Sequence, residues 1–398
     1  MPRSTRPTAP GTPAWLRTRN DREALALLLE HGELTRLQLG ELTGLSKPTA
    51  SQMVHRLAAA GVIKETGEVS AGRGPNAVSY GVQLDVALGV AVDIEERLLT
   101  ATVVDVSGAE REVVELELPA RGARRSATGD VRAAIDAACA AAGADVDSVT
   151  AVCIGVQGAV DPRTDALRFT DTLPGWQRRN VRAGLEHELG LAVTIENDVN
   201  LAAVAERTRG AAAGAGGFGL LWLGKGLGFA LDLAGVVQPG TSGGAGEIGY
   251  LPVPREAASL DPAARDLQDL IGGGPLVRLA RRFGAAGRGY SATIDRLTTS
   301  TEARAEVVAE LAPRVALGII PVLALLDPEQ IVLGGPTGAM GGAELATAVA
   351  AHVRRTTGWN PRVVPTGIPR HAVLFGACER LAGALQDQLF DRIERLSP

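Results

Sequence analysis

Two short segments of the chain carry side chains that could recognise or activate a hydroxyl group. Asn197 and Asp198 stand directly before a predicted helix over 199–209, and Glu247 lies inside the glycine-rich run 243–249. A carboxylate within hydrogen-bond reach of a hydroxyl can accept its proton, and an amide can both donate and accept hydrogen bonds. Asp198 could also cap the helix that follows it, and the two roles are compatible.

A second group of side chains suits contact with nucleic acid. Four apolar residues at the spacing i, i+3, i+4 and i+7 predict one buried helix face: Ala50, Met53, Val54 and Leu57. The opposite face is polar and cationic, and its members are Lys47, Ser51, Gln52, His55 and Arg56. Such a face can enter a DNA major groove, where Thr49 at its edge could touch a phosphate or a thymine methyl group. Taken singly, each residue could belong to an ordinary solvated helix.

Three helices and a β-hairpin would position this polar face. We predict that the helices begin at Asn20, at Thr35 with Gln38 completing a capping box, and at Ser46. A glycine-containing turn at Gly44 precedes the third helix, and an apolar strand with a glycine-rich return follows it. This order predicts a winged helix-turn-helix over residues 20–82, preceded by a flexible basic arm over 1–19.

The tip of the predicted wing, over 71–76, carries Arg73 between glycines. An arginine there could enter a minor groove, where the negative potential is enhanced, and so read the shape of the DNA. An ordinary exposed turn arginine is the alternative.

Charge and composition limit the class of protein. The 398 residues carry a net charge of −5, yet residues 1–82 hold ten Lys and Arg against seven Asp and Glu. The basic excess is therefore local to the predicted DNA-binding unit. The longest uncharged apolar stretch, 315–326, has 12 residues and contains Gly318 and Pro321, too few for the ~20 that span a bilayer. We expect a cytoplasmic protein with three buried cysteines and no membrane span.

From about residue 85 onward, predicted strands alternate with predicted helices. The first unit has strands over 87–92, 98–106, 112–118 and 149–155 and a helix over 131–142. The second has strands over 218–223, 228–233 and 330–333 and helices over 344–353 and 377–389. This alternation is typical of α/β domains, and two such lobes predict a cleft between them.

Five short motifs occur in order along this body. They are Gly155-Val156-Gln157-Gly158-Ala159-Val160-Asp161, Leu173-Pro174-Gly175-Trp176, Glu196-Asn197-Asp198-Val199-Asn200, Gly246-Glu247-Ile248-Gly249 and Val332-Leu333-Gly334-Gly335. On these motifs the body resembles the ROK family of repressors, open reading frames and sugar kinases. The resemblance implies a two-lobed, actin-like ATPase (ribonuclease H-like) α/β fold, with lobe 1 over 86–200, the C-terminal helix returning to it, and lobe 2 over 201–398. The winged helix resembles that of the family's transcriptional regulators.

The segments that would face nucleotide phosphates depart from the family's kinases. Those kinases place Asp-x-Gly-Gly-Thr after the first strand, whereas this chain has Asp93-Ile94-Glu95-Glu96-Arg97. Two side chains would fill the space for backbone approach, and like charges ~4 Å apart cost about 1 to 4 kcal/mol. The second hairpin keeps its glycines but gains Phe229. We expect weak ATP binding, no cofactor and no kinase activity, although Asp198 matches the family's catalytic base.

The resemblance also implies a ligand site made of Gly158, Asn197, Asp198, Glu247 and Tyr250. Tyr250 replaces a family histidine and Thr172 a family asparagine, yet a tyrosine can still hydrogen-bond and stack on a sugar ring. The family's zinc motif is absent, because 251–274 contains neither Cys nor His, so we expect no metal. The basic clusters, among them Arg121, Arg124 and Arg125, are interpreted as solvated loops.

These observations predict a transcriptional regulator, a repressor, that binds double-stranded operator DNA as a homodimer or homotetramer. A small-molecule effector, a carbohydrate or a relative of one, would bind between the lobes. Two alternatives stay open. One is an ATP-dependent sugar kinase with an appended DNA-binding domain, and the other is a ligand-independent DNA-binding regulator with a vestigial cleft.

Overall fold

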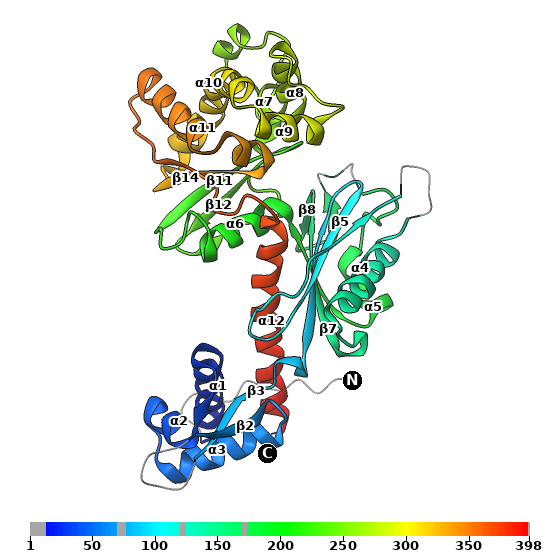
Figure 1. Ribbon diagram of the computed structural model, residues 1–398, viewed down its shortest axis with the longest axis vertical. Coiled ribbons are helices and arrows are strands. Elements are labelled where there is room, and N and C mark those ends of the chain that lie inside the picture. The colour runs from blue at the N-terminus through cyan, green and yellow to red at the C-terminus, as the bar shows by residue number, and fades with distance from the viewer. Residues whose placement is uncertain (1–12, 70–76, 120–124, 169, 171–172, 397–398) are drawn as a thin grey trace.

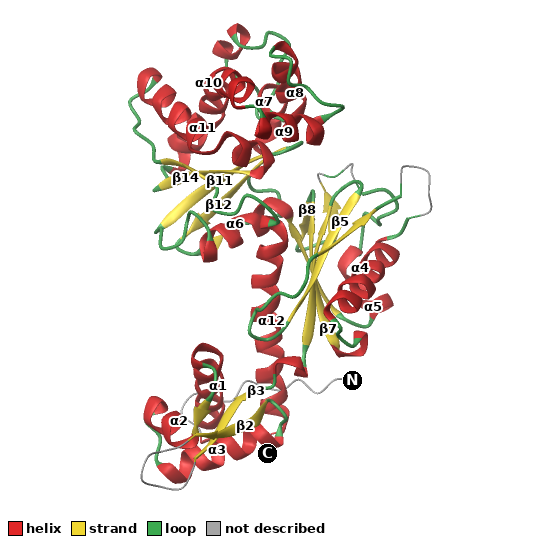
Figure 2. Cartoon of the chain, viewed as in Figure 1, coloured by secondary structure: helices red, strands yellow, loops and turns green. Residues whose placement is uncertain are grey.

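The computed structural model describes residues 13–69, 77–119, 125–168, 170 and 173–396. They form a small N-terminal head and two α/β lobes, and one long C-terminal helix runs between the head and the lobes (Figures 1 and 2). This is the predicted fold class, a two-lobed α/β body with an N-terminal winged helix-turn-helix.

The head contains three helices and a three-stranded sheet of order β1-β3-β2. Its elements are α1 (Pro13–His31), β1 (Leu34–Thr35), α2 (Arg36–Thr43), α3 (Lys47–Ala59), β2 (Ile63–Val69) and β3 (Ala77–Val82). The predicted capping box is confirmed, because Gln38 N donates to Thr35 Oγ1 at 3.3 Å and Thr35 N donates to Gln38 Oε1 at 2.9 Å. Helix α2 ends at Gly44, whose φ of 68° is left-handed and suits glycine.

The start of the first helix was predicted wrongly. Helix α1 begins at Pro13, seven residues before Asn20, which therefore lies inside the helix and does not cap it. Proline is well tolerated in a first helical turn, because its missing N–H would have no helical partner there. The predicted wing is present as β2 and β3, while its tip with Arg73 lies outside the described residues.

Lobe 1 is built on the five-stranded sheet β10-β7-β4-β5-β6. Strands β4 and β7 pair in parallel, as do β7 and β10, whereas β5 and β6 run antiparallel. Its elements are β4 (Leu88–Ile94), β5 (Leu98–Val104), β6 (Val114–Glu117), α4 (Ala127–Ala142), β7 (Val149–Val156), β8 (Ala159–Asp161), β9 (Ala166–Arg168), α5 (Val181–Leu189) and β10 (Ala192–Asn197), with the 3-10 turns η1 (Leu84–Val86) and η2 (Val146–Ser148). Helices pack on both faces of the central strands, which explains their continuous apolar runs.

Lobe 2 is built on the sheet β13-β12-β11-β14-β15. Its elements are α6 (Asp198–Arg209), β11 (Gly217–Leu223), β12 (Leu227–Leu233), β13 (Val236–Val237), η3 (Ile248–Tyr250), η4 (Arg255–Ser259), α7 (Leu267–Ile271), α8 (Gly273–Arg282), α9 (Tyr290–Thr299), α10 (Thr301–Leu326), β14 (Gln330–Gly334), α11 (Gly335–Thr356) and β15 (Val363–Pro365). Side chains of β11 alternate between two cores, since Leu220 joins one and Leu221 the other.

Helix α10 is the one described helix that is long and apolar enough to cross a membrane. In its most apolar window, 61% of the helix is buried inside the protein. It packs against α11, α7 and α8, so its apolar side chains fill the core of lobe 2.

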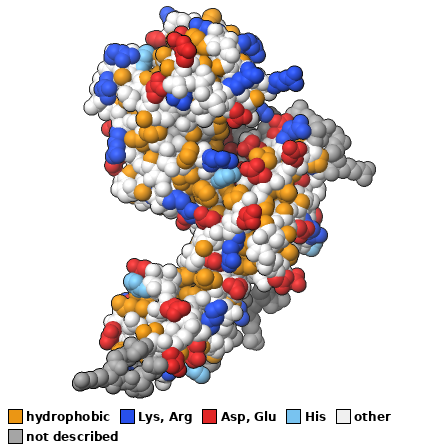
Figure 3. All heavy atoms as spheres, viewed as in Figure 1, with side chains coloured by type: hydrophobic (Ala, Val, Ile, Leu, Met, Phe, Trp, Pro, Cys, Tyr) orange, Lys and Arg blue, Asp and Glu red, His pale blue; other side chains and the backbone are white. Residues whose placement is uncertain are grey.

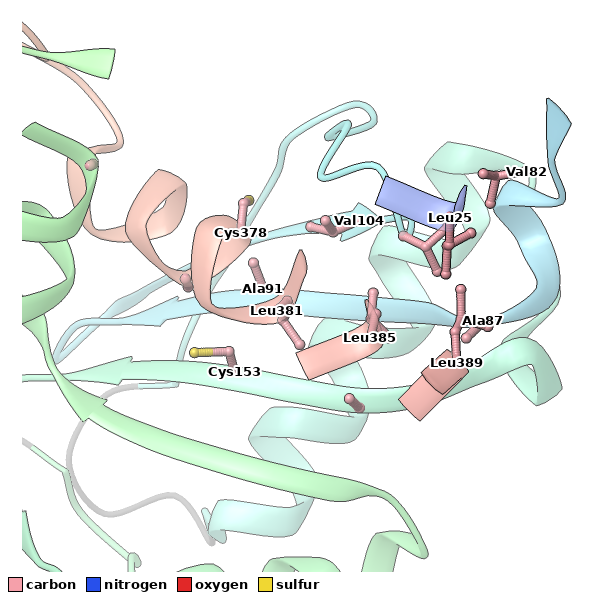
Figure 4. Packing of buried hydrophobic residues seen from close by; sticks show 14 of the residues in the cluster. Leu25, Val82, Ala87, Ala91, Val104, Cys153, Cys378, Leu381, Leu385 and Leu389 are labelled. Atoms are coloured by element: carbon pink, nitrogen blue, oxygen red, sulfur yellow. The ribbon is translucent and has the colours of Figure 1, made fainter. Parts of the chain in front are cut away.

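Helix α12 (Ala372–Leu396) joins the head to the body. It contacts α6, β4 and β7 along its first half and α1 near its end. A single hydrophobic core runs along it, from Leu25 in the head past Leu389 and Leu385 to Ala91 of β4 (Figure 4). The head is therefore packed onto the body through shared core residues.

Candidate functional site

The predicted ligand residues gather where β10 passes into α6. Asn197 is the N-cap of α6, because its Oδ1 accepts from Asn200 N at 3.0 Å. Its Nδ2 donates to Gly158 O at 2.9 Å and ties the turn before β8 to this helix start. The suggestion that Asp198 caps the helix is wrong. Asp198 is the first helical residue, and Asn197 performs that role.

Gly158 and Gly246 bring backbone segments close together beside this helix start. Gly158 has a φ of 146°, and a Cβ there would lie 2.7 Å from Arg168 O. Gly246 has a φ of 87°, and a Cβ there would lie 1.8 Å from Phe229 O. Only glycine fits both positions without rearrangement, so the loop that carries Glu247 lies directly on strand β12.

Four carboxylates share this region, which we call the inter-lobe site: Asp93, Glu95, Asp198 and Glu247. Burial raises the pKa of Asp198 to about 7, and the charges of Glu247 and Glu95 add to the shift. Burial also raises the pKa of Asp93 well above its usual value, reinforced by Glu95 and Asp198, and it raises that of Glu247. Their mutual effects place these groups close enough to interact electrostatically.

These pKa shifts predict that stability depends on pH. An acid whose pKa is raised by folding contributes stability that is fully present below its unfolded pKa and is lost as pH rises through its folded pKa. We expect the melting temperature of Asp198→Asn to rise relative to that of the unsubstituted protein as the pH increases from about 4 to about 7. Differential scanning fluorimetry across this range measures the difference, with the exposed Asp295→Asn on α9 as control. Parallel curves for all three proteins would contradict the assignment.

Tyr250 differs from the other predicted ligand residues in its exposure. It ends η3 and is 68% exposed, whereas Glu247, three residues earlier, is partly buried. Thr172, the other substituted position, lies outside the described residues. The structure thus brings Gly158, Asn197, Asp198 and Glu247 together and leaves Tyr250 largely open to solvent.

A separate apolar pocket lies on the far side of the Glu247 loop. It has a volume of about 260 Å³ and is lined by Phe229, Leu231, Gln238, Ala245, Gly246, Ile248, Leu251, Pro321, Val322, Leu325 and Leu326. Ordinary ligand pockets measure ~300 to 1,000 Å³, and this one offers few polar groups for orienting a ligand. The sequence reasoning did not identify it, because its residues come from distant segments.

The structure also contradicts one interpretation of the basic residues. Arg125 was interpreted as part of a solvated loop, but its side chain is 2% exposed and pairs with Asp130 at 2.8 Å. Trp176 Nε1 donates to the same carboxylate at 3.1 Å. Charge density along the sequence cannot distinguish a solvated arginine from one whose partner is buried beside it.

The candidate DNA-contacting face is the outer side of α3. Lys47, Ser51, Gln52 and His55 are exposed there, while Met53 and Leu57 on the opposite side are buried. Thr49 is half-buried, and its Oγ1 lies 2.8 Å from Ser46 Oγ.

Arg56 has a different role from the predicted one. Its guanidinium bonds to Asp21 of α1 at 2.6 and 3.2 Å, and Asp21 is 1% exposed. Burial raises the pKa of Asp21, and the bonds from Arg56 oppose that shift. Arg56 therefore holds α3 against α1, and the prediction that it faces DNA is wrong.

Charges of both signs are interspersed on the face of the molecule in view in Figure 3. In the part of the chain that the structure describes, no three His, Cys, Asp or Glu side chains are grouped so that they could hold a metal ion. The expectations of no metal and no cofactor stay predictions.

Comparison with known proteins supplies a family. The sequence profile of the ROK family matches residues 90–381, and that of a winged helix-turn-helix DNA-binding domain matches residues 17–64. An uncharacterized protein of Clostridium perfringens is 33% identical over 193 residues, which cover 48% of this chain and 62% of that protein. The chain thus spans less than two thirds of the length of that relative.

Solved structures share the architecture. The structure of a ROK family transcriptional regulator, a homologue of the E. coli MLC protein, covers 96% of this chain, and 99% of that chain is matched, with a TM-score of 0.69 and 19% identity. At that identity the likeness shows the fold. A ROK family glucokinase from Streptomyces griseus, in complex with glucose and AMPPNP, covers 74% of this chain and 99% of its own, with a TM-score of 0.60 and 26% identity. From the family match, this chain belongs to the ROK family and carries an N-terminal winged helix-turn-helix DNA-binding domain.

Proposed function

We propose that this protein is a cytoplasmic transcriptional repressor that binds operator DNA through α3 and senses a sugar or a sugar-derived ligand at the inter-lobe site. One observation carries the proposal. The exposed polar face of α3 belongs to a head whose core continues through α12 into the two-lobed body. A change in the body can therefore alter the position of the DNA-binding face.

Symmetry supports binding as a homodimer or homotetramer to a palindromic operator. A single winged helix presents one short helix to a major groove, so high affinity requires a second copy on a second half-site. Half-sites one helical turn apart would bring two copies of α3 to the same face of the DNA. A movement of the lobes would then change the spacing between the two α3 helices.

The double substitution Ser51→Ala and Gln52→Ala tests the DNA-binding face. Both side chains are exposed, so the fold should be unaffected. Loss of a base contact costs about 1 to 3 kcal/mol, so we expect affinity for the operator to fall about 10- to 100-fold or more. Fluorescence anisotropy with DNA from upstream of the protein's own gene, at fixed salt, measures the change.

The control for this experiment is Ser291→Ala on α9, an exposed serine in lobe 2. It should bind DNA with unchanged affinity. If the unsubstituted protein forms no salt-sensitive, sequence-specific complex with any upstream fragment, the proposal of a transcriptional regulator fails.

The inter-lobe site supports the sensing part of the proposal. Asn197, Asp198 and Glu247 offer one amide and two carboxylates for hydrogen bonds to hydroxyl groups. A ligand that binds only the folded protein must raise its melting temperature. A thermal-shift screen with neutral sugars therefore tests for an effector, and a screen with no shift would favour the ligand-independent regulator.

An ATP-dependent sugar kinase is the second candidate, because Asp198 keeps the position of the family's catalytic base and glucokinases are among the relatives. Glu95 and Glu96 oppose this function, since they place acidic side chains where family kinases have glycines. A coupled ADP-release assay across a sugar panel separates the candidates. Turnover that disappears in Asp198→Asn would establish the kinase and overturn the assignment as a non-enzyme.

A further inference from the structure

An ion pair joins the two lobes at turns that face each other. Glu96 lies in the turn between β4 and β5 of lobe 1, and Lys225 lies in the turn between β11 and β12 of lobe 2. Their Oε2 and Nζ atoms are 2.6 Å apart. The side chains are 34% and 63% exposed, so the pair is accessible to solvent and to salt.

Buried contacts fix the lobe 1 end of this pair. The carbonyl of Glu96 accepts a hydrogen bond from Arg125 Nη1 at 2.9 Å. Arg125 is itself held by Asp130, which also accepts from Trp176 Nε1. Because these three side chains are almost fully buried, the turn that carries Glu96 is held in one position relative to the lobe 1 core.

The lobe 2 end is fixed by a second set of bonds. The carbonyl of Lys225 accepts from Gln268 Nε2 at 3.0 Å and from Gly273 N at 3.1 Å. Gln268 Oε1 in turn accepts from Leu227 N at 2.7 Å. A Cβ at Gly273 would lie 2.9 Å from Lys225 Cα, so α8 begins in direct contact with this turn.

We propose that Glu96 and Lys225 form an electrostatic latch that sets the angle between the lobes when no ligand is bound. Both backbones are anchored to their own lobes, so little ordering entropy opposes the pair beyond that of the two side chains. Desolvation raises the pKa of Glu95 beside the latch, and Lys225 opposes that shift, so the same cation also offsets the repulsion among the acids.

The latch replaces what a bound ligand would otherwise have to supply. A ligand that prefers a different lobe angle must break or stretch the Glu96–Lys225 contact, and this contact therefore contributes to the threshold of the response. This regulatory meaning rests on the proposed function. The latch itself can be tested without ligand or DNA, so its failure and that of the proposed function are distinguishable.

Distance measurement between the lobes tests the latch in the full chain. The three native cysteines are buried, so spin labels can be attached at Ala133→Cys on α4 and Glu306→Cys on α10, both exposed sites. An exposed ion pair contributes a 1.5- to 5-fold factor, and we expect Lys225→Met and Glu96→Gln each to raise the ratio of displaced to native lobe separation by about that factor. Pulsed electron paramagnetic resonance measures the distance distribution.

Two controls separate the latch from a general loss of charge. Lys225→Arg keeps a cation at the turn and should retain the native distribution. Glu310→Gln removes a comparable pair with Arg282 at 3.3 Å, which lies within lobe 2, and should change nothing. High salt should shift the unsubstituted protein toward the Lys225→Met distribution. Distributions for Lys225→Met and Glu96→Gln that match the unsubstituted protein would overturn the proposal.

Discussion

Replacing Arg56 by alanine should destabilise the head by about 3 kcal/mol, because removing one partner of a buried ion pair leaves the other charge uncompensated. Asp21 is 1% exposed and accepts both of the guanidinium bonds described above. Without Arg56, burial would raise the pKa of Asp21 further, so the loss should be smallest in acid and grow with pH. Chemical denaturation followed by circular dichroism measures this effect.

The double variant Asp21→Asn and Arg56→Ala separates charge from packing. Because the buried charge is then absent, it should recover part of the stability lost in Arg56→Ala. A variant Arg56→Ala with unchanged stability and a selective loss of operator affinity would contradict the structural role. It would return Arg56 to the DNA-contacting face predicted from the sequence.

Shortening Leu385 to alanine should cost about 2 to 5 kcal/mol, the range measured for removing a buried leucine side chain. Leu385 is fully buried in α12, within the core that links the head to lobe 1. We also expect reduced operator affinity, because a loosened joint lets the head sample orientations that do not fit two half-sites. Thermal unfolding and anisotropy on the same sample measure both effects.

Leu325→Ala is the matched control, since it deletes the same atoms from a side chain that is 82% exposed at the end of α10. Its stability should stay within about 0.5 kcal/mol of the unsubstituted protein. If Leu385→Ala lowers the melting temperature and leaves operator affinity unchanged, the continuous core stabilises the fold without orienting the head.

Features set by neighbouring residues could be predicted from the sequence. The buried face of α3 follows from the spacing of Ala50, Met53, Val54 and Leu57, and all four are buried. The capping box of α2 follows from Thr35 and Gln38. The alternation of strands and helices gave the α/β lobes, although most boundaries differ by a few residues because helix and strand ends depend on packing.

Features set by partners far along the chain could not be predicted in this way. Arg56 lies on the face that the helical period assigns to solvent, yet its partner Asp21 is 35 residues away and buried. Arg125 was misassigned for the same reason. Glu96 and Lys225 were each noted as departures from a glycine-rich or threonine-containing turn, but nothing in their own segments indicates that the two turns meet.

The final turns of α12 lie against the head, where Glu394 pairs with Arg22 of α1 at 3.5 Å and Arg22 lies 4.8 Å from the ring of Phe390 (Figure 1). A reporter or purification tag fused after Leu396 would consequently sit beside the DNA-facing domain. Such a fusion competes with the operator for space. Exposed surface turns of lobe 2, at the opposite end of the molecule, offer insertion points that leave the DNA accessible.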